Sequence, residues 1–241
     1  MLHDGARALV VDPGEASGVQ ACLAEHRLTL DAILITHHHV NHTGGVAVLR
    51  EATGARVIGP VGEPMPEPLQ RVAGGQTAKV LGLRFVVIDV PGHAAGHIAY
   101  YLEEMDGAPL LFCGDTLFSA GCGRLFECTP AQMLTSLSRL AALPAATRVY
   151  CAHEHTLSNL RFAQAVEPDN MALTQYRQWC NNQRAKNLPT LPSSIGLEQA
   201  VNPFLRAHQP SLAVAAQAHN LACGGDPLEI FAALREWKNV F

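Results

Sequence analysis

Four histidines fall within six positions of one stretch, Thr36-His37-His38-His39-Val40-Asn41-His42, and a short apolar run typical of a β-strand precedes it. Alternate side chains of an extended chain point the same way. We therefore expect His37 and His39 to face one metal ion and His38 to face elsewhere. Histidine at this density is far above its ordinary usage in proteins. The stretch predicts a metal-binding loop at the end of a strand.

Apolar runs alternate with helical patterns on both sides of this loop. The runs that indicate strands are 8–11, 32–36, 56–58, 85–90, 110–113 and 148–152. Helical patterns cover 17–26, the residues after Gly45, and a segment capped by Thr129 with Pro130 at its first position. Beyond about residue 155 only helical patterns remain, over 171–184, 211–221 and 227–238, the last one capped by Asp226. This order predicts an α/β domain that ends just after His153, followed by helices.

Three more polar residues each follow a strand-like run: His93, Asp115 and His153. Because strand ends converge on one edge of a sheet in open α/β folds, these distant residues can meet. Taken singly, His93 is equally consistent with a hydrogen-bonded structural residue, and Asp115 with a helix cap or a turn. We expect His97 to support a ligand. The other histidines, His3, His26, His208 and His219, are assigned no ligand role.

Composition limits the class of partner. The chain has 241 residues, of which 48% are hydrophobic, and a formal net charge of −4. It can therefore fill a core, and it offers no basic field for nucleic acid or an anionic membrane. A small-molecule partner is favoured. The apolar runs are too short for a signal peptide or a membrane span, so we expect a cytoplasmic protein. We also expect a monomer.

Seven cysteines are scattered without a CxxC pair, which indicates free thiols. Cys22, Cys113 and Cys151 lie among apolar neighbours, so we expect them to be buried. Cys122 and Cys128 lie in a polar, glycine-containing loop, where a reactive or metal-binding role stays open. An inert role is favoured, because a nucleophilic cysteine needs a base partner that this loop does not offer.

These motifs together resemble the metallo-β-lactamase superfamily, whose THxHxDH loop, downstream His, bridging Asp and final His hold two metal ions. Three runs are similar more specifically to glyoxalase II, the hydroxyacylglutathione hydrolases: LLFCGDTLF (110–118), AGCGRLFE (120–127) and AHEHTLSN (152–159). In the tail, NPFLR (202–206) and LREWK (234–238) resemble the glutathione-binding domain of that family. The resemblance implies an α/β fold, with an αββα sandwich over 1–154 and a small helical domain over 155–241.

The resemblance also implies a pair of metal ions. The first would be bound by His37, His39 and His93, and the second by His42 and His153, with Asp115 bridging both. It implies zinc, although iron and manganese stay open because histidine and carboxylate ligands suit all three metals. A hydroxide held between the two ions would be the nucleophile, because such cations lower the pKa of bound water.

The implied reaction is hydrolysis of S-2-hydroxyacylglutathione, usually S-D-lactoylglutathione, to glutathione and D-lactate in methylglyoxal detoxification. The positions that match glutathione-binding residues of the family are Arg124, Phe126, His155, Arg235 and Lys238. Cationic side chains suit a tripeptide rich in carboxylates. Without the resemblance, Arg235 and Lys238 would indicate a solvated face of the last helix.

The chain departs from the family at four points. Asn41 stands where the family has an aspartate ligand of the second metal, and a neutral amide binds zinc less well than a carboxylate. We therefore expect a weakly held second ion. His155 and Phe126 stand where tyrosines are usual, so two hydroxyls are lost. The chain also begins late, which indicates either a different start or a missing edge strand.

Two alternatives accompany the hydrolase. One is a weakened paralogue that binds metal and glutathione conjugates without efficient turnover, suggested by Asn41 and His155. The other is the related persulfide dioxygenase, which shares the front half and uses one iron. The motifs at 202–206 and 235–238 favour the hydrolase over the dioxygenase.

Overall fold

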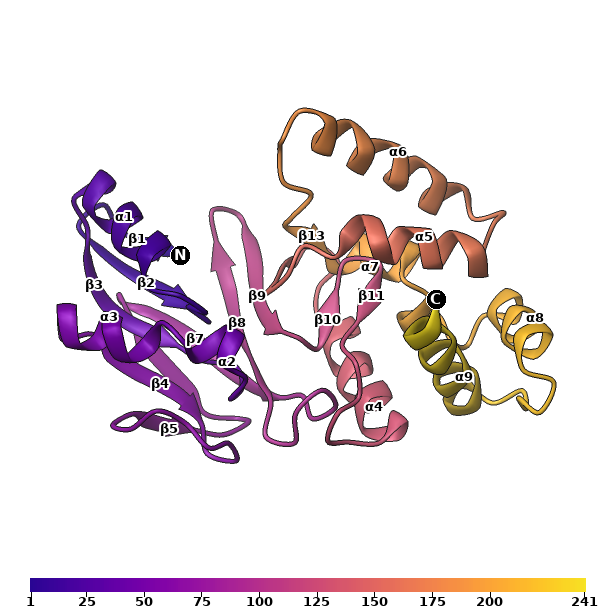
Figure 1. The fold of residues 1–241 in the computed structure, drawn as a ribbon, viewed down its shortest axis with the longest axis horizontal. Coiled ribbons are helices and arrows are strands. Elements are labelled where there is room, and N and C mark those ends of the chain that lie inside the picture. Colours follow the sequence, from indigo (N-terminus) through magenta and orange to yellow (C-terminus); the bar gives the residue numbers. More distant parts are fainter.

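Two β-sheets pack face to face in the computed structural model, which describes residues 1–241 (Figure 1). The first sheet contains, in spatial order, β1 (Leu2–His3), β2 (Arg7–Val11), β3 (Thr29–Leu34), β4 (Arg56–Pro60) and β5 (Gln70–Val72). The second contains β13 (Ser193–Ser194), β12 (Arg148–Cys151), β9 (Ala108–Gly114), β8 (Ile98–Met105), β7 (Leu83–Asp89) and β6 (Thr77–Val80). Buried side chains such as Leu34, Phe85 and Tyr100 form the core between them.

Helices cover the outer face of each sheet. The first sheet packs against α1 (Ser17–His26) and α3 (Val46–Thr53). The second packs against α4 (Pro130–Ala141), α5 (Thr156–Val166) and α9 (Pro227–Val240). The remaining helical segments are α2 (Val40–Thr43), α6 (Met171–Ala185), α7 (Ile195–Val201), the 3₁₀ turn η1 (Pro203–Leu205) and α8 (Pro210–His219). This arrangement confirms the predicted αββα sandwich followed by a helical C-terminal part.

The helix starts follow local capping chemistry. Thr129 accepts a hydrogen bond from the Gln132 N–H, and the Gln132 side chain accepts one from the Thr129 N–H, so a capping box opens α4. Asp226 accepts hydrogen bonds from two N–H groups in the first turn of α9. Both caps were predicted from the sequence. No helix in the structure is both long and apolar enough to cross a membrane.

Several features differ from the sequence-based expectations. The strand expected over 32–36 already ends at Leu34. The tail, expected to be helical only, contributes β13, because Ser194 adopts the extended conformation of a helix N-cap and its segment pairs with β12. At the edge of the first sheet, where no strand was expected, β1 pairs antiparallel with β2.

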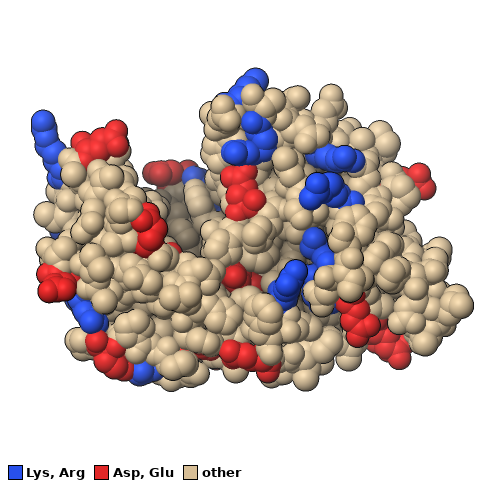
Figure 2. Space-filling model, viewed as in Figure 1, with Lys and Arg blue, Asp and Glu red and all other residues tan.

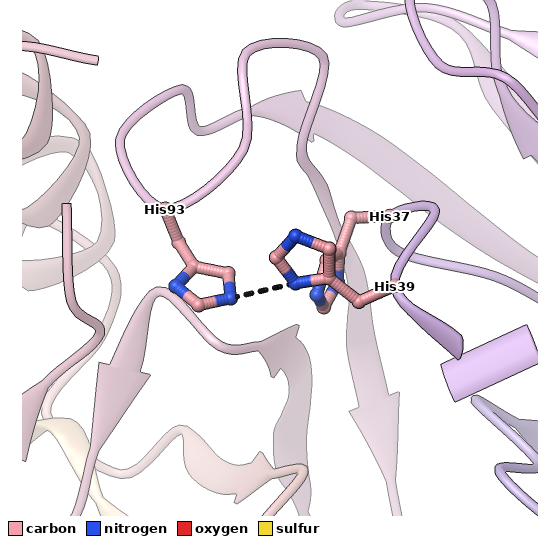
Figure 3. Close-up of side chains that lie close together, drawn as sticks. All are labelled: His37, His39 and His93. Atoms are coloured by element: carbon pink, nitrogen blue, oxygen red, sulfur yellow. Dashed lines mark hydrogen bonds between the residues drawn. The ribbon is translucent and has the colours of Figure 1, made fainter. Parts of the chain in front are cut away.

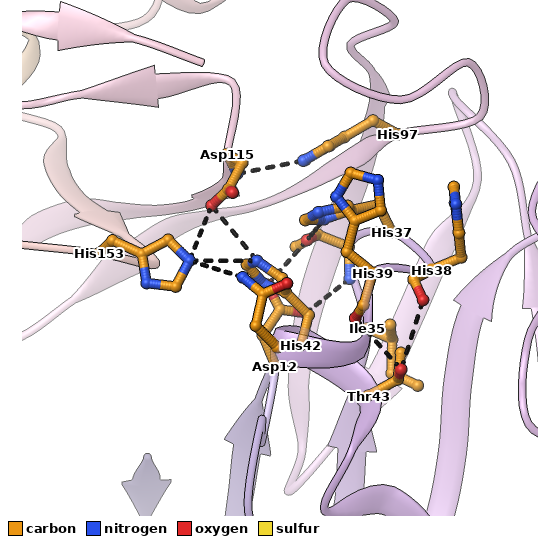
Figure 4. A network of polar contacts seen from close by, with 12 residues as sticks. Asp12, Ile35, His37, His38, His39, His42, Thr43, His97, Asp115 and His153 are labelled. Atoms are coloured by element: carbon orange, nitrogen blue, oxygen red, sulfur yellow. Dashed lines mark hydrogen bonds and ion pairs between the residues drawn. The ribbon is translucent and has the colours of Figure 1, made fainter. Parts of the chain in front are cut away.

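Strand direction determines where the polar loops lie. β2, β3 and β4 are mutually parallel, and β12 runs parallel to β9. The loops that follow β3, β7, β9 and β12 carry the histidines and the aspartate singled out in the sequence. These loops converge at one edge of the sandwich, between the two sheets (Figure 4).

Candidate metal centre

The first ligand cluster consists of His37, His39 and His93, whose ring nitrogens lie within 4.8 Å of one another. His93 Nε2 lies 3.0 Å from His39 Nδ1, and Figure 3 shows the three rings converging from two loops. His93 Nδ1–H donates to the Arg124 carbonyl at 2.9 Å, which leaves the Nε2 lone pair facing the cluster. The structure therefore brings together the three residues predicted for the first metal.

The second cluster consists of His42, Asp115 and His153 (Figure 4). Asp115 Oδ1 lies 3.4 Å from His42 Nε2 and 3.5 Å from His153 Nε2. Its other oxygen, Oδ2, lies 3.4 Å from His93 Nε2 in the first cluster. The Asp115 carboxylate thus stands between the clusters, in the position expected of a bridging ligand.

Asn41 also reaches the second cluster. Its side-chain Nδ2 lies 3.0 Å from His153 Nε2, while the residue as a whole is exposed. The side chain offers a neutral amide where a carboxylate would complete a ligand set. The second cluster therefore has three strong donors, His42, Asp115 and His153. One of them, Asp115, also faces the first cluster.

Unpaired polar atoms show that a cation fits between the clusters. His37 Nε2 and Asp115 Oδ1 are buried, and no hydrogen bond reaches either atom. A buried acceptor without a partner costs free energy, so such atoms are rare unless an ion or water satisfies them. Imidazole nitrogens and carboxylate oxygens are the donors that zinc, iron and manganese accept.

Burial and neighbouring charges set the protonation of these ligands. Burial, with further repulsion from nearby histidines, lowers the pKa of His37 far below its usual range, and burial also lowers the pKa of His39 and His93. These rings are therefore neutral and carry lone pairs for a metal. Burial opposes the charged form of His42 too, but Asp115 and Asp12 outweigh it and raise the pKa of His42 to about 9.

Two residues outside the clusters, Asp12 and His97, contact the ligand residues and hold them in place. Asp12 accepts hydrogen bonds from the Thr36 N–H at 2.8 Å and the Thr36 hydroxyl at 2.7 Å, and it lies 3.1 Å from His42 Nδ1. His97 Nε2 accepts the Asp115 N–H at 3.2 Å, and its ring stacks on that of His37 with centroids 4.4 Å apart. His97 is where the sequence placed it, as a support. Asp12 was missed.

A glycine permits this close packing around the bridging carboxylate. Gly114 has a φ of +49°, and a Cβ there would lie 2.3 Å from Thr36 Oγ1 and 2.8 Å from His97 Nε2. Any larger residue would push apart the loops that carry the two clusters. The Gly114–Asp115 pair at the end of β9 is therefore a steric requirement of the site.

A cavity of about 580 Å³ opens beside the metal centre. His93 and Asp115 form its inner end, and all five residues matched to glutathione binding line it: Arg124, Phe126, His155, Arg235 and Lys238. Figure 2 shows Lys and Arg side chains gathered over the region of α5 and α9 that borders this cavity. The size suits a tripeptide thioester.

The cations of α9 belong to this cavity. Arg235 is only 3% exposed, its Nη1 donates to the Cys122 carbonyl at 3.0 Å, and its Nε has no partner. Without the family resemblance, the sequence predicted that Arg235 lies on a solvated face of the last helix. That prediction is wrong, because Arg235 is buried. Burial, followed by repulsion from Arg235, lowers the pKa of Lys238 to about 8. Neither residue forms an ion pair within the chain, so the two positive charges beside the cavity are not neutralised by a carboxylate of the protein.

Substitutions at the two tyrosine positions leave aromatic surfaces. The Phe126 side chain is 62% exposed, and its ring centroid lies 5.1 Å from that of His93. The His155 ring packs against Phe118 and His153, with centroids 5.2 Å and 5.4 Å away. Both rings border the cavity, so they can contact a substrate although the hydroxyls are absent.

Cys122 borders the cavity, where its Sγ lies 3.6 Å from Arg235 Nη1. All seven cysteines are free, as predicted, and Cys113 and Cys151 are buried, whereas the prediction that Cys22 is buried is wrong, because it is only partly covered. Burial raises the pKa of the thiols of Cys113, Cys122 and Cys151, and burial with the nearby Glu127 charge raises that of Cys128. A thiol with a raised pKa is a poor nucleophile at neutral pH. The raised pKa values favour the interpretation of Cys122 and Cys128 as inert thiols, which stays a prediction.

Comparison with known proteins gives two family matches that together span the chain. Residues 1–153 match the metallo-β-lactamase superfamily, and residues 154–241 match the hydroxyacylglutathione hydrolase C-terminus. A hydroxyacylglutathione hydrolase of Albidiferax ferrireducens is 63% identical over 241 residues, which cover 100% of this chain and 94% of that protein. One from Pseudomonas aeruginosa strain PAO1 is 55% identical, with coverage of 98% and 91%.

Solved structures agree with the fold. The crystal structure of ETHE1 from Myxococcus xanthus has 26% sequence identity and a TM-score of 0.62, and covers 97% of this chain and 88% of that one. The BLEG-1 B3 metallo-β-lactamase, at 24% identity and a TM-score of 0.62, covers 85% and 91% and shares the fold. From the two family matches and the relatives that share its full length, the chain belongs to the hydroxyacylglutathione hydrolases of the metallo-β-lactamase superfamily.

Proposed function

We propose that the chain hydrolyses S-2-hydroxyacylglutathione, with S-D-lactoylglutathione as its usual substrate, at the metal centre described above. The main support is that one cavity is lined both by Asp115 and His93 of the metal centre and by three cations, Arg124, Arg235 and Lys238. A thioester at the inner end would place the carboxylates of glutathione among these cations. The C-terminal family match favours this reaction over the dioxygenase, and relatives over the full length favour it over a weakened paralogue.

The metals are assigned to the residues that the structure brings together. His37, His39 and His93 would hold one ion, His42 and His153 the other, and Asp115 would bridge them. Zinc is the proposed metal, and iron and manganese fit the same donors. When bound, such ions acidify a water molecule and polarise the thioester carbonyl.

The protein's own residues bind and orient the substrate. Arg235 and Lys238 lie three residues apart on α9, so they face the same side of the helix and can share one carboxylate. Arg124 belongs to the same loop as Phe126. Its carbonyl accepts from His93 Nδ1, and its side chain lines the cavity. Charge-assisted hydrogen bonds from these cations would fix the tripeptide, so that the acyl group points toward the clusters.

The leaving group requires no acid from the protein. The thiol of glutathione has a pKa of about 8.5, so it departs readily as a thiolate near neutral pH. The inert cysteines described above are consistent with a reaction in which they do not participate.

Asn41 makes the second metal the weaker of the two. Its amide replaces an anionic donor, so the ion at His42, Asp115 and His153 loses one unit of compensating charge. We propose that the protein as isolated holds less than a full complement of metal there. Two tightly held ions per chain that resist mild chelation would contradict this.

Steady-state hydrolysis of S-D-lactoylglutathione tests the proposed reaction, with thiol release and loss of thioester absorbance followed together. The zinc-loaded protein should turn over, and His93→Gln should lose nearly all activity. Sulfite formation from glutathione persulfide by the iron-loaded protein, without thioesterase activity, would overturn the proposal in favour of the dioxygenase. The cytoplasmic location and the monomeric state stay predictions, and light scattering after size-exclusion chromatography decides the latter.

A further inference from the structure

We propose that His38, Glu63 and Glu127 form a clamp that positions the first metal cluster and joins it to the loop that binds substrate. In Figure 4 the His38 side chain points away from Asp115 and His153, and its ring centroid lies 4.7 Å from that of His39. Its ring instead meets Glu63 through Nδ1 and lies 3.5 Å from Glu127 Oε1 through Nε2. This inference rests on the proposed metal site. It assigns a role to His38, the middle residue of the 37–39 run.

Glu63 connects two ligand loops through one buried carboxylate. The residue is 4% exposed. Its Oε2 accepts the His38 N–H at 3.2 Å in addition to the ring contact, and its Oε1 accepts the Gly96 N–H at 2.5 Å. His38 lies between His37 and His39, and Gly96 lies next to His97. One side chain therefore fixes the backbone of both loops.

Local packing holds Glu63 in this place. A Cβ on Gly96 would lie 2.6 Å from the Gly62 carbonyl carbon and 2.9 Å from Glu63 Cγ, so only glycine permits the approach of the two loops. Arg71 Nη1 donates to the Glu63 carbonyl at 3.0 Å and to the Pro60 carbonyl at 3.3 Å. The two carboxylate oxygens of Glu63 accept the N–H groups of His38 and Gly96, which makes burial of the charge tolerable.

Glu127 connects the same histidine to the substrate side. Its Oε2 accepts the Ala95 N–H at 2.7 Å, two residues after His93. It directly follows Phe126, whose ring centroid lies 5.9 Å from that of His39 and 5.1 Å from that of His93. A shift of Glu127 would therefore move Phe126 relative to the first cluster.

The clamp explains why the middle histidine suits this loop. Glu63 accepts the His38 N–H and contacts the His38 ring, while Glu127 faces the other ring nitrogen, so the conformation of the loop that carries His37 and His39 is restrained at its middle residue. Glu63 and His38 are positioning residues, since neither belongs to a metal-ligand cluster of the proposed site. Their effect is on the geometry of the ligands and of the substrate loop.

The test compares Glu63→Gln with Glu104→Gln, the same change at an exposed residue of β8. An amide cannot accept from both His38 and Gly96, because one of its two ends donates. We expect about tenfold weaker affinity for the first equivalent of Co²⁺, measured by competition with a chromophoric chelator. The visible absorption spectrum of the bound Co²⁺ should change as well, since it reports ligand geometry. Glu104→Gln should match wild type in both measurements.

Glu127→Gln tests the other half of the clamp. Its carboxylate is about one-third exposed, so this variant is expected to fold even where Glu63→Gln does not. We expect KM for S-D-lactoylglutathione to rise several-fold with little change in kcat, because the displaced loop carries Arg124 and Phe126.

The outcomes are separable. Wild-type Co²⁺ affinity and spectrum in Glu63→Gln, or wild-type KM in Glu127→Gln, would overturn the clamp while the site itself stands. If Glu63→Gln fails to fold, the Glu127→Gln kinetics decide. If the wild-type protein binds no Co²⁺ and hydrolyses no thioester, the proposed function itself is contradicted.

Discussion

Replacing Asn41 with aspartate is the most informative single change to this protein. The substitution keeps the shape of the side chain and adds one negative charge beside the second ligand cluster. At present the Asn41 amide nitrogen lies 3.0 Å from His153 Nε2, within reach of any ion bound by His153, His42 and Asp115. We expect Asn41→Asp to strengthen binding of the second metal specifically.

The size of the effect follows from the position of the side chain. Asn41 is exposed, so the dielectric constant of water applies rather than that of a protein interior. A unit negative charge about 3 Å from a dication then gains roughly 2.8 kcal/mol, which corresponds to about a 100-fold tighter dissociation constant. The first cluster does not include Asn41, so its affinity should change much less.

Competition titration with a chromophoric chelator resolves the two metal equivalents and measures the affinity of each. Asn181→Asp supplies the matched control, because it adds the same charge at an exposed position of α6 outside both clusters. We expect the second equivalent to tighten in Asn41→Asp alone. The reasoning fails if wild type already binds two equivalents equally tightly, or if both variants shift the second equivalent by the same factor.

Four further predictions follow from the site. Lys238→Gln should raise KM about fivefold and leave kcat unchanged in steady-state kinetics, because it removes a hydrogen bond worth about 1 kcal/mol that is remote from the reacting carbonyl. In wild type, KM should rise as the pH increases through about 8, because Lys238 carries its charge below that pKa and loses it above; Lys238→Gln should not show this rise, and a flat wild-type profile would contradict the assignment. Asp12→Asn should weaken the second metal about tenfold in the chelator titration, since His42 loses the carboxylate that orients it, and unchanged affinity would refute that role. Chelation of the metals should abolish hydrolysis and lower Tm in a thermal melt, with recovery on adding zinc; metal-free protein with an unchanged Tm would show that binding and folding are uncoupled.

Much of the site could be predicted because its ligands sit at strand ends. His93, Asp115 and His153 each follow a strand with a strong apolar signal. Their positions at strand ends were therefore enough to predict that they lie close together. Asp12 was accessible by the same reasoning, since it follows β2 directly, next to β3 in a parallel pair. Glu63 gave no such signal. It lies in an irregular loop between β4 and β5, and only tertiary packing brings it to His38.

The fold was predictable in class but not in every strand. β8 runs through the middle of its sheet, and its first half, Ile98, Ala99 and Tyr100, is buried on both faces. Such a strand lacks the alternation of apolar and polar residues by which half-buried strands are recognised. Two-residue strands had no local signature, because they depend on a distant partner or on a turn. They are β1, β13 and the small hairpin of β10 (Leu117–Phe118) and β11 (Gly121–Cys122).

The distribution of ligands between the two sheets links the metal centre to the stability of the fold. His37, His39 and His42 come from the loop after β3 in the first sheet, whereas His93, Asp115 and His153 follow strands of the second. Each cluster draws on both sheets, so an ion in either would join the two halves of the sandwich at the edge where their loops meet. Without an ion, the buried and unpaired His37 Nε2 and Asp115 Oδ1 oppose that same closure. Metal binding and sheet packing therefore favour one another, and a ligand substitution such as Asn41 affects how firmly the sandwich closes as well as the reaction at its edge.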